Sequence, residues 1–161
     1  MCSAAREVAL FGVLGGLTFA AKLVMSPLPN IEPVSLLVML FAVTFGRKSL
    51  LPIYVYVLLE LTVFGFGLWT AAYLYVWAIL ALVARLLRRM ESPLGWAILS
   101  GTFGLLFGGL CVPVCLLTGG PAFAWSWWLS GIPFDLAHCA GNFALALVLF
   151  RPAHRLLKRL V

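Results

Sequence analysis

The sequence predicts an all-α membrane protein: one domain over residues 1–161 with six transmembrane helices and both termini in the cytoplasm. Of the 161 residues, 64% are hydrophobic and 10% charged, and the mean hydropathy is +1.12. A soluble domain of this size cannot bury so much apolar surface, so lipid must solvate most of it. The net charge of +6 comes from basic residues at the ends of apolar segments, which indicates membrane topology and not nucleic-acid binding.

The first three of six apolar segments are followed by clear helix-breaking signals. A span needs about 17–25 residues once tilt is counted. The first segment, about Ala5 to Met25, ends at SPLPNIEP, whose prolines cannot continue a helix. These prolines are Pro27, Pro29 and Pro33. The second, about Val34 to Phe45, ends at GRKS, and the third, about Leu50 to Phe64, ends at GFG. Both are short, so we expect them to be tilted or shielded by neighbouring helices.

The remaining three segments are longer. The fourth covers about Leu68 to Leu87 and ends in RLLRRMESPLG, and the fifth runs from Trp96 to about Leu117. A predicted loop, TGGPAFAWSWWLSGIP, leads to the sixth segment, about Phe134 to Phe150. The start, MCSAAREVALFGVLGG, lacks a basic region followed by a small-residue cleavage site, so we expect a retained first helix and not a signal peptide.

The basic residues orient these spans. Ten of the eleven Lys and Arg residues fall at alternate ends of the predicted helices: Arg6, Arg47, Lys48, Arg85, Arg88, Arg89, Arg151, Arg155, Lys158 and Arg159. The positive-inside rule makes that side cytoplasmic, so both termini are expected inside. The outer part of the protein then contains most of the remaining charge: Lys22, Glu32, Asp135 and His138, with Glu60 more than halfway along an outward-going helix.

Three polar side chains share one face of the sixth segment. Asp135, His138 and Asn142 stand at i, i+3 and i+7 in FDLAHCAGNFALALVLF. Polar groups are costly in hydrocarbon, so such a face is expected to meet a cavity or a partner. Because the chain has few other polar side chains, we expect a solute to be recognised here.

Other outer polar residues extend this face. Glu60 in YVLLELTVF must be paired, protonated or in contact with water. Lys22 is a partner for Glu60 or for a substrate carboxylate, unless it snorkels to the lipid headgroups. Asn30 and Glu32, in the proline-rich break, form either the rim of a pocket or a cap on the next helix or its loop.

Aromatic residues are dense on the same side. Trp69, Tyr73 and Trp77 follow an i, i+4, i+8 stripe, and three more tryptophans stand in the predicted outer loop: Trp125, Trp127 and Trp128. An aromatic belt at the membrane interface explains each one alone. Together with the polar face they predict a pocket for a flat heteroaromatic solute. The predicted binding residues are Asn30, Glu32, Glu60, Trp69, Tyr73, Trp125, Trp128, Asp135, His138 and Asn142.

Catalysis and metal binding have weaker signals. Asp135 and His138 could act as an acid–base pair, but no Ser or Cys nucleophile with an elbow motif is evident. Cys111 and Cys115, with His138 and Cys139, resemble a thiol–imidazole cluster, yet no CxxC or HExxH spacing is present. We therefore expect no catalytic residue, metal or cofactor, and expect the cysteines, Cys2 included, to pack as small hydrophobes. A membrane-embedded enzyme or a metal-ion-handling protein that uses these residues remains the alternative.

Small residues form a stripe on the first predicted helix. Ala5, Ala9, Gly12, Gly16 and Ala20 are spaced by four, three, four and four residues. Such stripes let membrane helices approach closely, so this one serves either internal packing or an interface with another subunit. A second set, which we assign to internal packing, lies in the fifth segment: Ser100, Gly104 and Gly108.

Taken together, these motifs resemble the substrate-binding S component of an energy-coupling factor (ECF) transporter. The resemblance spans essentially the whole length and rests on the size, the six predicted spans and two segments, LPNIEPVSLLVMLFAVTFG and SGIPFDLAHCAGNF. In addition, Ala5-x-x-x-Ala9 matches the AxxxA interaction motif of that family.

The resemblance implies a multi-pass subunit of a prokaryotic plasma membrane that binds a vitamin or related heterocyclic micronutrient from outside. Such a subunit has no catalysis of its own: it docks on a transmembrane T component joined to two cytoplasmic ATPases and topples to release the solute inward. This agrees with the absence of a Walker A sequence. Ala5 and Ala9, continued by Gly12 and Gly16, would face the T component. The solute is left open among candidates such as a cobalamin precursor, a pterin or a deazapurine.

Overall fold

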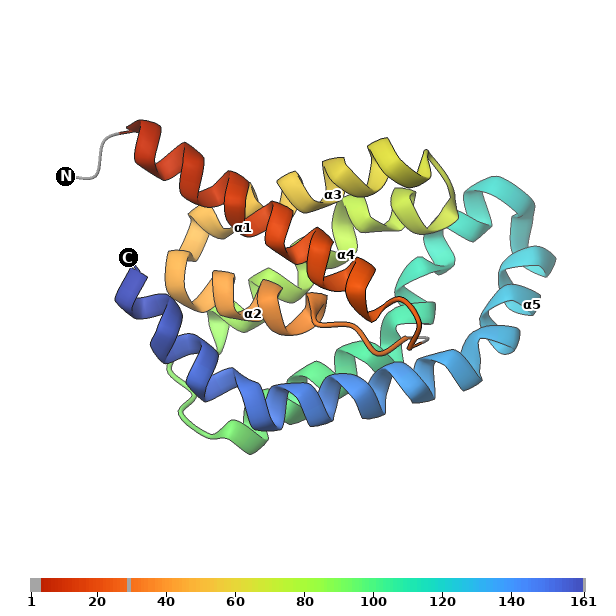
Figure 1. Cartoon of the computed structure of the whole chain (residues 1–161). Coiled ribbons are helices and arrows are strands. Elements are labelled where there is room, and N and C mark those ends of the chain that lie inside the picture. The colour runs from red at the N-terminus through yellow and green to blue at the C-terminus, as the bar shows by residue number, and fades with distance from the viewer. Residues whose placement is uncertain (1–3, 29, 161) are drawn as a thin grey trace.

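Helices make up nearly all of the chain that the structure describes. The structure, a computed structural model, covers residues 4–28 and 30–160, and no strand occurs in those residues (Figure 1). The elements in chain order are α1 (Ala4–Met25), α2 (Val34–Phe45), the 3-10 turn η1 (Gly46–Ser49), α3 (Leu50–Phe64), α4 (Leu68–Leu86) and α5 (Pro93–Leu160). The predicted all-α class is confirmed. Cys2 and Pro29 lie outside the described residues.

Glycines end α2 and α3 at the predicted positions. Gly46 follows α2 with φ 60°, and Gly65 follows α3 with φ 77°. Both angles lie in the left-handed region, which glycine adopts without the steric cost of a Cβ atom. The N–H of Gly65 donates to the carbonyl of Leu61 at 3.0 Å and closes the last turn of α3. The chain turns back at η1, so α2 and α3 run in opposite directions (Figure 1).

Two helices meet at a kink inside α5. The element is non-helical at Gly120, where φ is 77° and ψ is −178°. The predicted loop TGGPAFAWSWWLSGIP is otherwise helical, so that prediction was wrong. Pro121 directly follows the kink, and a proline at the start of a helix lacks only an N–H that would have no partner there. The second half of α5 then runs back toward the end of the molecule at which the chain begins (Figure 1).

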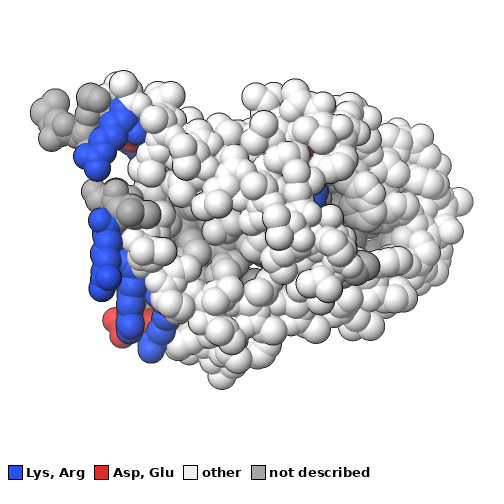
Figure 2. Space-filling view, in the orientation of Figure 1, with Lys and Arg blue, Asp and Glu red and all other residues white. Residues whose placement is uncertain are grey.

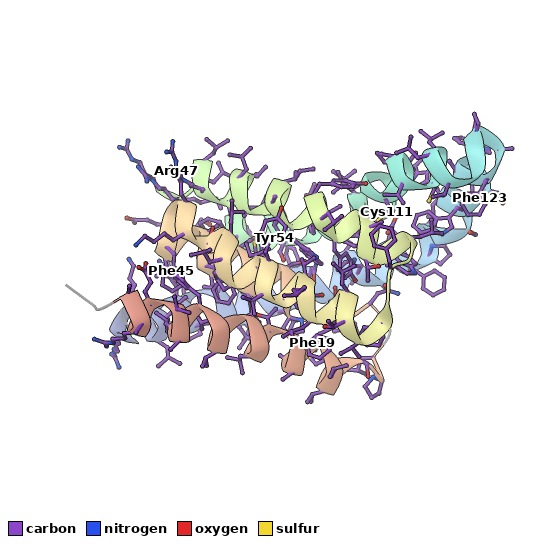
Figure 3. The ribbon with its side chains drawn as sticks, turned by 90° about the horizontal axis from the view of Figure 1, so that it is seen from above. Phe19, Phe45, Arg47, Tyr54, Cys111 and Phe123 are labelled. Atoms are coloured by element: carbon purple, nitrogen blue, oxygen red, sulfur yellow. The ribbon has the colours of Figure 1, made fainter. Side chains whose placement is uncertain are left out.

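Most of the basic residues gather at one end of the molecule. The N- and C-terminal ends lie at the same end in Figure 1, and Figure 2 shows the lysine and arginine side chains concentrated there. Arg47 lies at this end and Phe123 at the opposite end, as the view from above shows (Figure 3). We call the first the basic end.

Four stretches of helix are long and apolar enough to cross a membrane: Ala4–Met25, Val34–Phe64, Leu68–Leu86 and Pro93–Arg159. The second of these includes η1, and the fourth includes the Gly120 kink. Large apolar side chains are exposed on the outside, among them Val24, Leu86 and Leu117, with 79%, 74% and 90% of their surface accessible. An all-α, multi-pass membrane protein accounts for this exposure, because lipid solvates such side chains.

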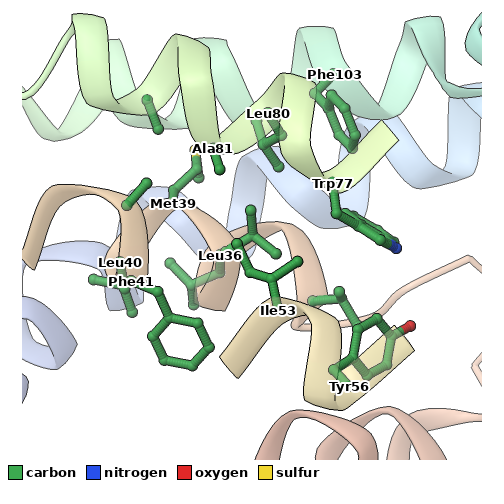
Figure 4. Packing of buried hydrophobic residues seen from close by; sticks show 14 of the residues in the cluster. Leu36, Met39, Leu40, Phe41, Ile53, Tyr56, Trp77, Leu80, Ala81 and Phe103 are labelled. Atoms are coloured by element: carbon green, nitrogen blue, oxygen red, sulfur yellow. The ribbon is translucent and has the colours of Figure 1, made fainter. Parts of the chain in front are cut away.

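The buried core joins α2 to α3, α4 and α5. Met39 of α2 and Trp77 of α4 are fully buried, and Figure 4 shows them packed among Ile53, Leu80 and Phe103. Trp77 also contacts Tyr73 and Phe107, with ring centroids 5.3 and 5.8 Å apart. These rings continue the core toward a cavity described below.

The small-residue stripe of α1 faces away from the rest of the chain. Helix α1 packs on α3 through a different glycine, Gly15: a Cβ atom there would lie 2.6 Å from the Val55 side chain and 2.7 Å from the Pro52 carbonyl oxygen. By contrast, a Cβ atom at Gly12 or Gly16 would meet nothing within 4 Å. Internal packing within the described residues therefore does not explain the stripe.

The small residues of the first half of α5 behave as predicted. Ser100, Gly104 and Gly108 are buried against the second half of the same element. A Cβ atom at Gly104 would lie 2.8 Å from the His138 backbone. Small side chains here permit close approach of the two halves, as expected for membrane helices.

Replacing Gly15 should separate α1 from α3. Because Gly15→Ala forces a methyl group against a backbone carbonyl, we expect a loss of about 1–3 kcal/mol of stability. Gly16→Ala is the matched control and should be neutral or gain up to about 1 kcal/mol from helix propensity. Thermal unfolding of the two variants in detergent measures the difference. Equal stability would contradict the close contact at Gly15.

Candidate functional site

A cavity of about 420 Å³ lies at the end of α3 that is remote from η1. Its walls come from the end of α1, the connection to α2, the end of α3, the start of α4 with the turn before it, and both halves of α5. Its lining residues are Lys22, Met25, Ser26, Leu28, Asn30, Ile31, Glu32, Glu60, Phe64, Gly65, Gly67, Trp69, Thr70, Tyr73, Phe107 and His138. The volume lies within the range typical of small-molecule sites.

An ion pair joins α1 to α3 in the cavity wall. The Nζ atom of Lys22 is 2.6 Å from Oε2 of Glu60, and the side chains are 21% and 2% exposed. Lys22 Nζ also lies 3.4 Å from the Tyr73 hydroxyl and 5.2 Å from the centroid of the Tyr73 ring. A charge so buried is tolerated only with a close partner, which Lys22 supplies to Glu60. The second carboxylate oxygen, Oε1, has no hydrogen-bond partner among the described residues.

His138 and Glu32 face each other across the same cavity. The distance from His138 Nε2 to Glu32 Oε1 is 3.9 Å, with side chains 4% and 15% exposed. His138 packs edge-on against Phe107, and in the described part of the chain its Nε2 atom has no hydrogen-bond partner. Burial raises the pKa of Glu32 from 4.5 to about 7; Lys22 acts in the opposite direction, and the nearby Glu60 adds to the rise.

Aromatic rings form the apolar part of the wall. Tyr73 stacks on Tyr56, with centroids 6.2 Å apart, and lies edge-on to Phe107 at 6.3 Å. Trp69, 52% exposed, lies at the mouth and contacts Trp127 with ring centroids 5.0 Å apart. The wall therefore offers ring faces and edges to a flat solute next to the charged groups.

A second cavity of about 370 Å³ adjoins the first. Asn30, Trp69 and Phe107 line both. Asp135 lines the second one, and its Oδ1 atom accepts a hydrogen bond from the Gly108 N–H at 3.0 Å. This bond links the two halves of α5, so Asp135 serves packing as well as the cavity.

The ten predicted binding residues divide into three groups: six line the first cavity, Asp135 lines only the second one, and Asn142, Trp125 and Trp128 line neither. The first cavity brings together Asn30, Glu32, Glu60, Trp69, Tyr73 and His138. Asn142 lines neither cavity: its Nδ2 atom donates to Ser35 Oγ at 3.0 Å and to the Ser100 carbonyl at 3.3 Å, which ties α2 to both halves of α5. Trp125 and Trp128 contact each other at 5.4 Å and also lie outside the lining of both cavities.

Two phenylalanines line the first cavity but are absent from the sequence-based set. Phe64 is the last residue of α3, directly before the GFG turn, and Phe107 stands at i+4 from Phe103, a spacing that marks one face of the fifth segment. Neither residue has a polar group, so nothing in the sequence separated them from the many other apolar side chains.

Trp127, and not Trp125 or Trp128, lines the second cavity. The cavity-lining residues of this part of α5 are Trp127, Ser130, Gly131, Phe134 and Asp135. They stand at i, i+3, i+4, i+7 and i+8, which is the spacing of a single helix face. Because this segment was predicted as a loop, the helical spacing of these residues was not used.

The described cysteines and histidines are not arranged as metal ligands. Cys111 and Cys115 are buried in the apolar interior of the first half of α5. No group of three or more His, Cys, Asp and Glu residues in the described part of the chain is arranged to hold a metal ion.

The fold and the cavity together define a class: a helical, multi-pass membrane protein with an aromatic-lined, charged cavity away from its basic end. Comparisons with protein-family models, with curated proteins and with solved structures gave no match.

The raised pKa of Glu32 predicts pH-dependent stability. Between pH 4.5 and about 7 the folded protein binds a proton that the unfolded chain releases, so stability should fall as pH rises through this window. We expect the melting temperature in detergent to fall between about pH 5 and about pH 8. Glu32→Gln should reduce this fall, since it removes the ionisable group, whereas Glu91→Gln in the exposed α4–α5 connection should not. An unchanged slope in Glu32→Gln would contradict the prediction. The charged and titratable groups near Glu32 are Lys22, Tyr56, Glu60, Tyr73 and His138.

Proposed function

We propose that the chain is the S component of an ECF-type importer. In this role it binds a vitamin or related heterocyclic micronutrient from outside and delivers it through a transmembrane T component and two cytoplasmic ATPases. It has no catalysis and no cofactor of its own, and ATP hydrolysis belongs to the partner subunits.

The proposal includes six membrane passes with both termini in the cytoplasm of a prokaryotic cell. Two observations support it: η1 and Gly120 divide the two longest apolar stretches at points where the chain reverses, and both termini lie at the basic end. Under the positive-inside rule the basic end faces the cytoplasm. The cavity then opens toward the outside.

The observation that carries the proposal is the pair of unpartnered polar atoms in the aromatic cavity. Glu60 Oε1 and His138 Nε2 are buried and have no hydrogen-bond partner among the described residues. Leaving such groups unsatisfied costs about 1–3 kcal/mol each. A solute with an N–H or O–H donor for the carboxylate and a polar edge for the imidazole satisfies both. A flat ring system would stack on Tyr73 and Phe107.

The open stripe on α1 supports the proposed docking on a T component. Ala5, Ala9 and Gly12 are exposed, and Gly16 has open space beside it. A smooth helix face of this kind gains packing contacts from a partner helix, which is the usual basis of association in membranes.

Ligand retention tests the binding role. Mass spectrometry of small molecules released from the purified protein should find an organic heterocycle at about one per chain. His138→Ala should weaken binding of that molecule by about tenfold, the effect of one lost hydrogen bond and its packing. Thr118→Ala is the control, because the exposed Thr118 hydroxyl donates to the carbonyls of Val114 and Cys115 in its own helix turn and lines neither cavity. Stoichiometric zinc or cobalt without an organic solute would instead favour the metal-handling alternative.

The docking role has its own test. Ala9→Trp places a large ring on the open stripe, far from the cavity, and should abolish uptake by cells that carry the complete transporter. Binding of the retained solute by the purified variant should stay within about twofold of the original, because no cavity residue changes. If binding and uptake fell together, the stripe would not be a docking face.

A further inference from the structure

A further concave site lies at the basic end, apart from the first and second cavities. It has a volume of about 550 Å³ and is formed by the α4–α5 connection and the last part of α5. Five cationic side chains converge on it: Arg88, Arg89, Arg151, Arg155 and Lys158. The proposed solute binding does not use them.

The site has a defined framework. Arg151 Nη2 donates to the Glu91 carbonyl at 2.8 Å and links the two segments. Trp96 Nε1 donates to the Met90 carbonyl at 3.0 Å, and the Trp96 ring stacks on Phe150 with centroids 4.3 Å apart and planes 14° apart. The five cationic side chains therefore line the same cavity as the stacked rings of Trp96 and Phe150.

Membrane orientation alone does not require this convergence. The positive-inside rule depends on the number of basic residues near the spans, not on their meeting in one concavity. Glu91 also lines this cavity, but within residues 4–28 and 30–160 no carboxylate forms a salt bridge with any of the five cations. An anion from outside the chain can therefore neutralise them.

Exposed aliphatic side chains of α4 lie next to the cations. Arg88 and Arg89 also line an adjoining groove that contains Leu82 and Leu86, whose side chains are 57% and 74% exposed. Leu156, 60% exposed, lies on the α5 segment that carries Arg155. Cations next to exposed aliphatic side chains match a ligand with an anionic head and hydrocarbon tails, whereas a soluble phosphate needs only the cations.

From this arrangement we propose that the basic-end cavity binds the phosphate headgroup of an anionic phospholipid, with the acyl chains along the apolar surface of α4. Guanidinium groups bind phosphate oxygens in bidentate fashion, and basic pockets between membrane helices at the cytoplasmic side suit such headgroups. The proposal rests on membrane embedding, and it holds whatever solute the other cavity binds.

Native mass spectrometry of the full chain in detergent tests the proposal. With added phosphatidylglycerol we expect a one-to-one adduct that phosphatidylcholine does not form. Arg88→Gln with Arg155→Gln should lower the adduct population by about tenfold or more, since two charged hydrogen-bonding groups are lost. The control, Arg47→Gln with Arg159→Gln, removes the same charge at the same end but outside the cavity lining, and should change the adduct by less than about twofold.

A second pair keeps the test independent of one variant's folding. Arg89→Gln with Lys158→Gln must reproduce the loss. Equal loss in the control pair would reduce the effect to general surface charge, and an equal adduct with phosphatidylcholine would remove the role of the anionic headgroup. Displacement of phosphatidylglycerol by inorganic phosphate at the same concentration would assign the site to soluble phosphates. Each of these outcomes, like the absence of any adduct, overturns the proposal.

Discussion

The ion pair between Lys22 and Glu60 is the constraint around which the first cavity is organised. It places a carboxylate that is 2% exposed inside an apolar helix bundle, which is tolerated only because a lysine from another helix lies 2.6 Å away. The pair joins α1 to α3 at the point where the connection to α2 begins. The ion pair uses only one oxygen of the Glu60 carboxylate. The other oxygen, Oε1, has no hydrogen-bond partner among the described residues.

The two charged regions of the molecule are separated by an apolar core. In the first cavity, two carboxylates and one lysine lie among aromatic rings, and burial raises the pKa of Glu32. At the basic end, arginines and a lysine surround an open concavity that Glu91 also lines, and in the described chain none of these cations forms a salt bridge. The charge balances at the two ends of the bundle are opposite, which is the basis for the two ligands proposed above: a polar heterocycle in the first cavity and a phosphate headgroup at the basic end.

Helix boundaries were predictable where the backbone itself imposes them. Gly46 and Gly65 end α2 and α3 because their positive φ angles are costly for other residues, and the sequence marks both positions. The segment around Pro121 was predicted as a loop, yet only Gly120 leaves the helical conformation. Proline at the start of a helix and proline in a loop look alike in a sequence, so the sequence alone did not separate the two conformations.

The sequence by itself determined that lipid solvates this chain, which end carries the basic residues and which residues are polar enough to need an explanation. Only the tertiary structure decided how those polar residues are used. Asp135, His138 and Asn142 share a helical face, but a rise of 1.5 Å per residue spreads them over about 10 Å along the axis. They therefore meet different neighbours: Asp135 binds the Gly108 N–H, His138 lines the cavity, and Asn142 ties α2 to α5. A shared face is a property of the sequence, whereas a shared site depends on what the rest of the fold places opposite it.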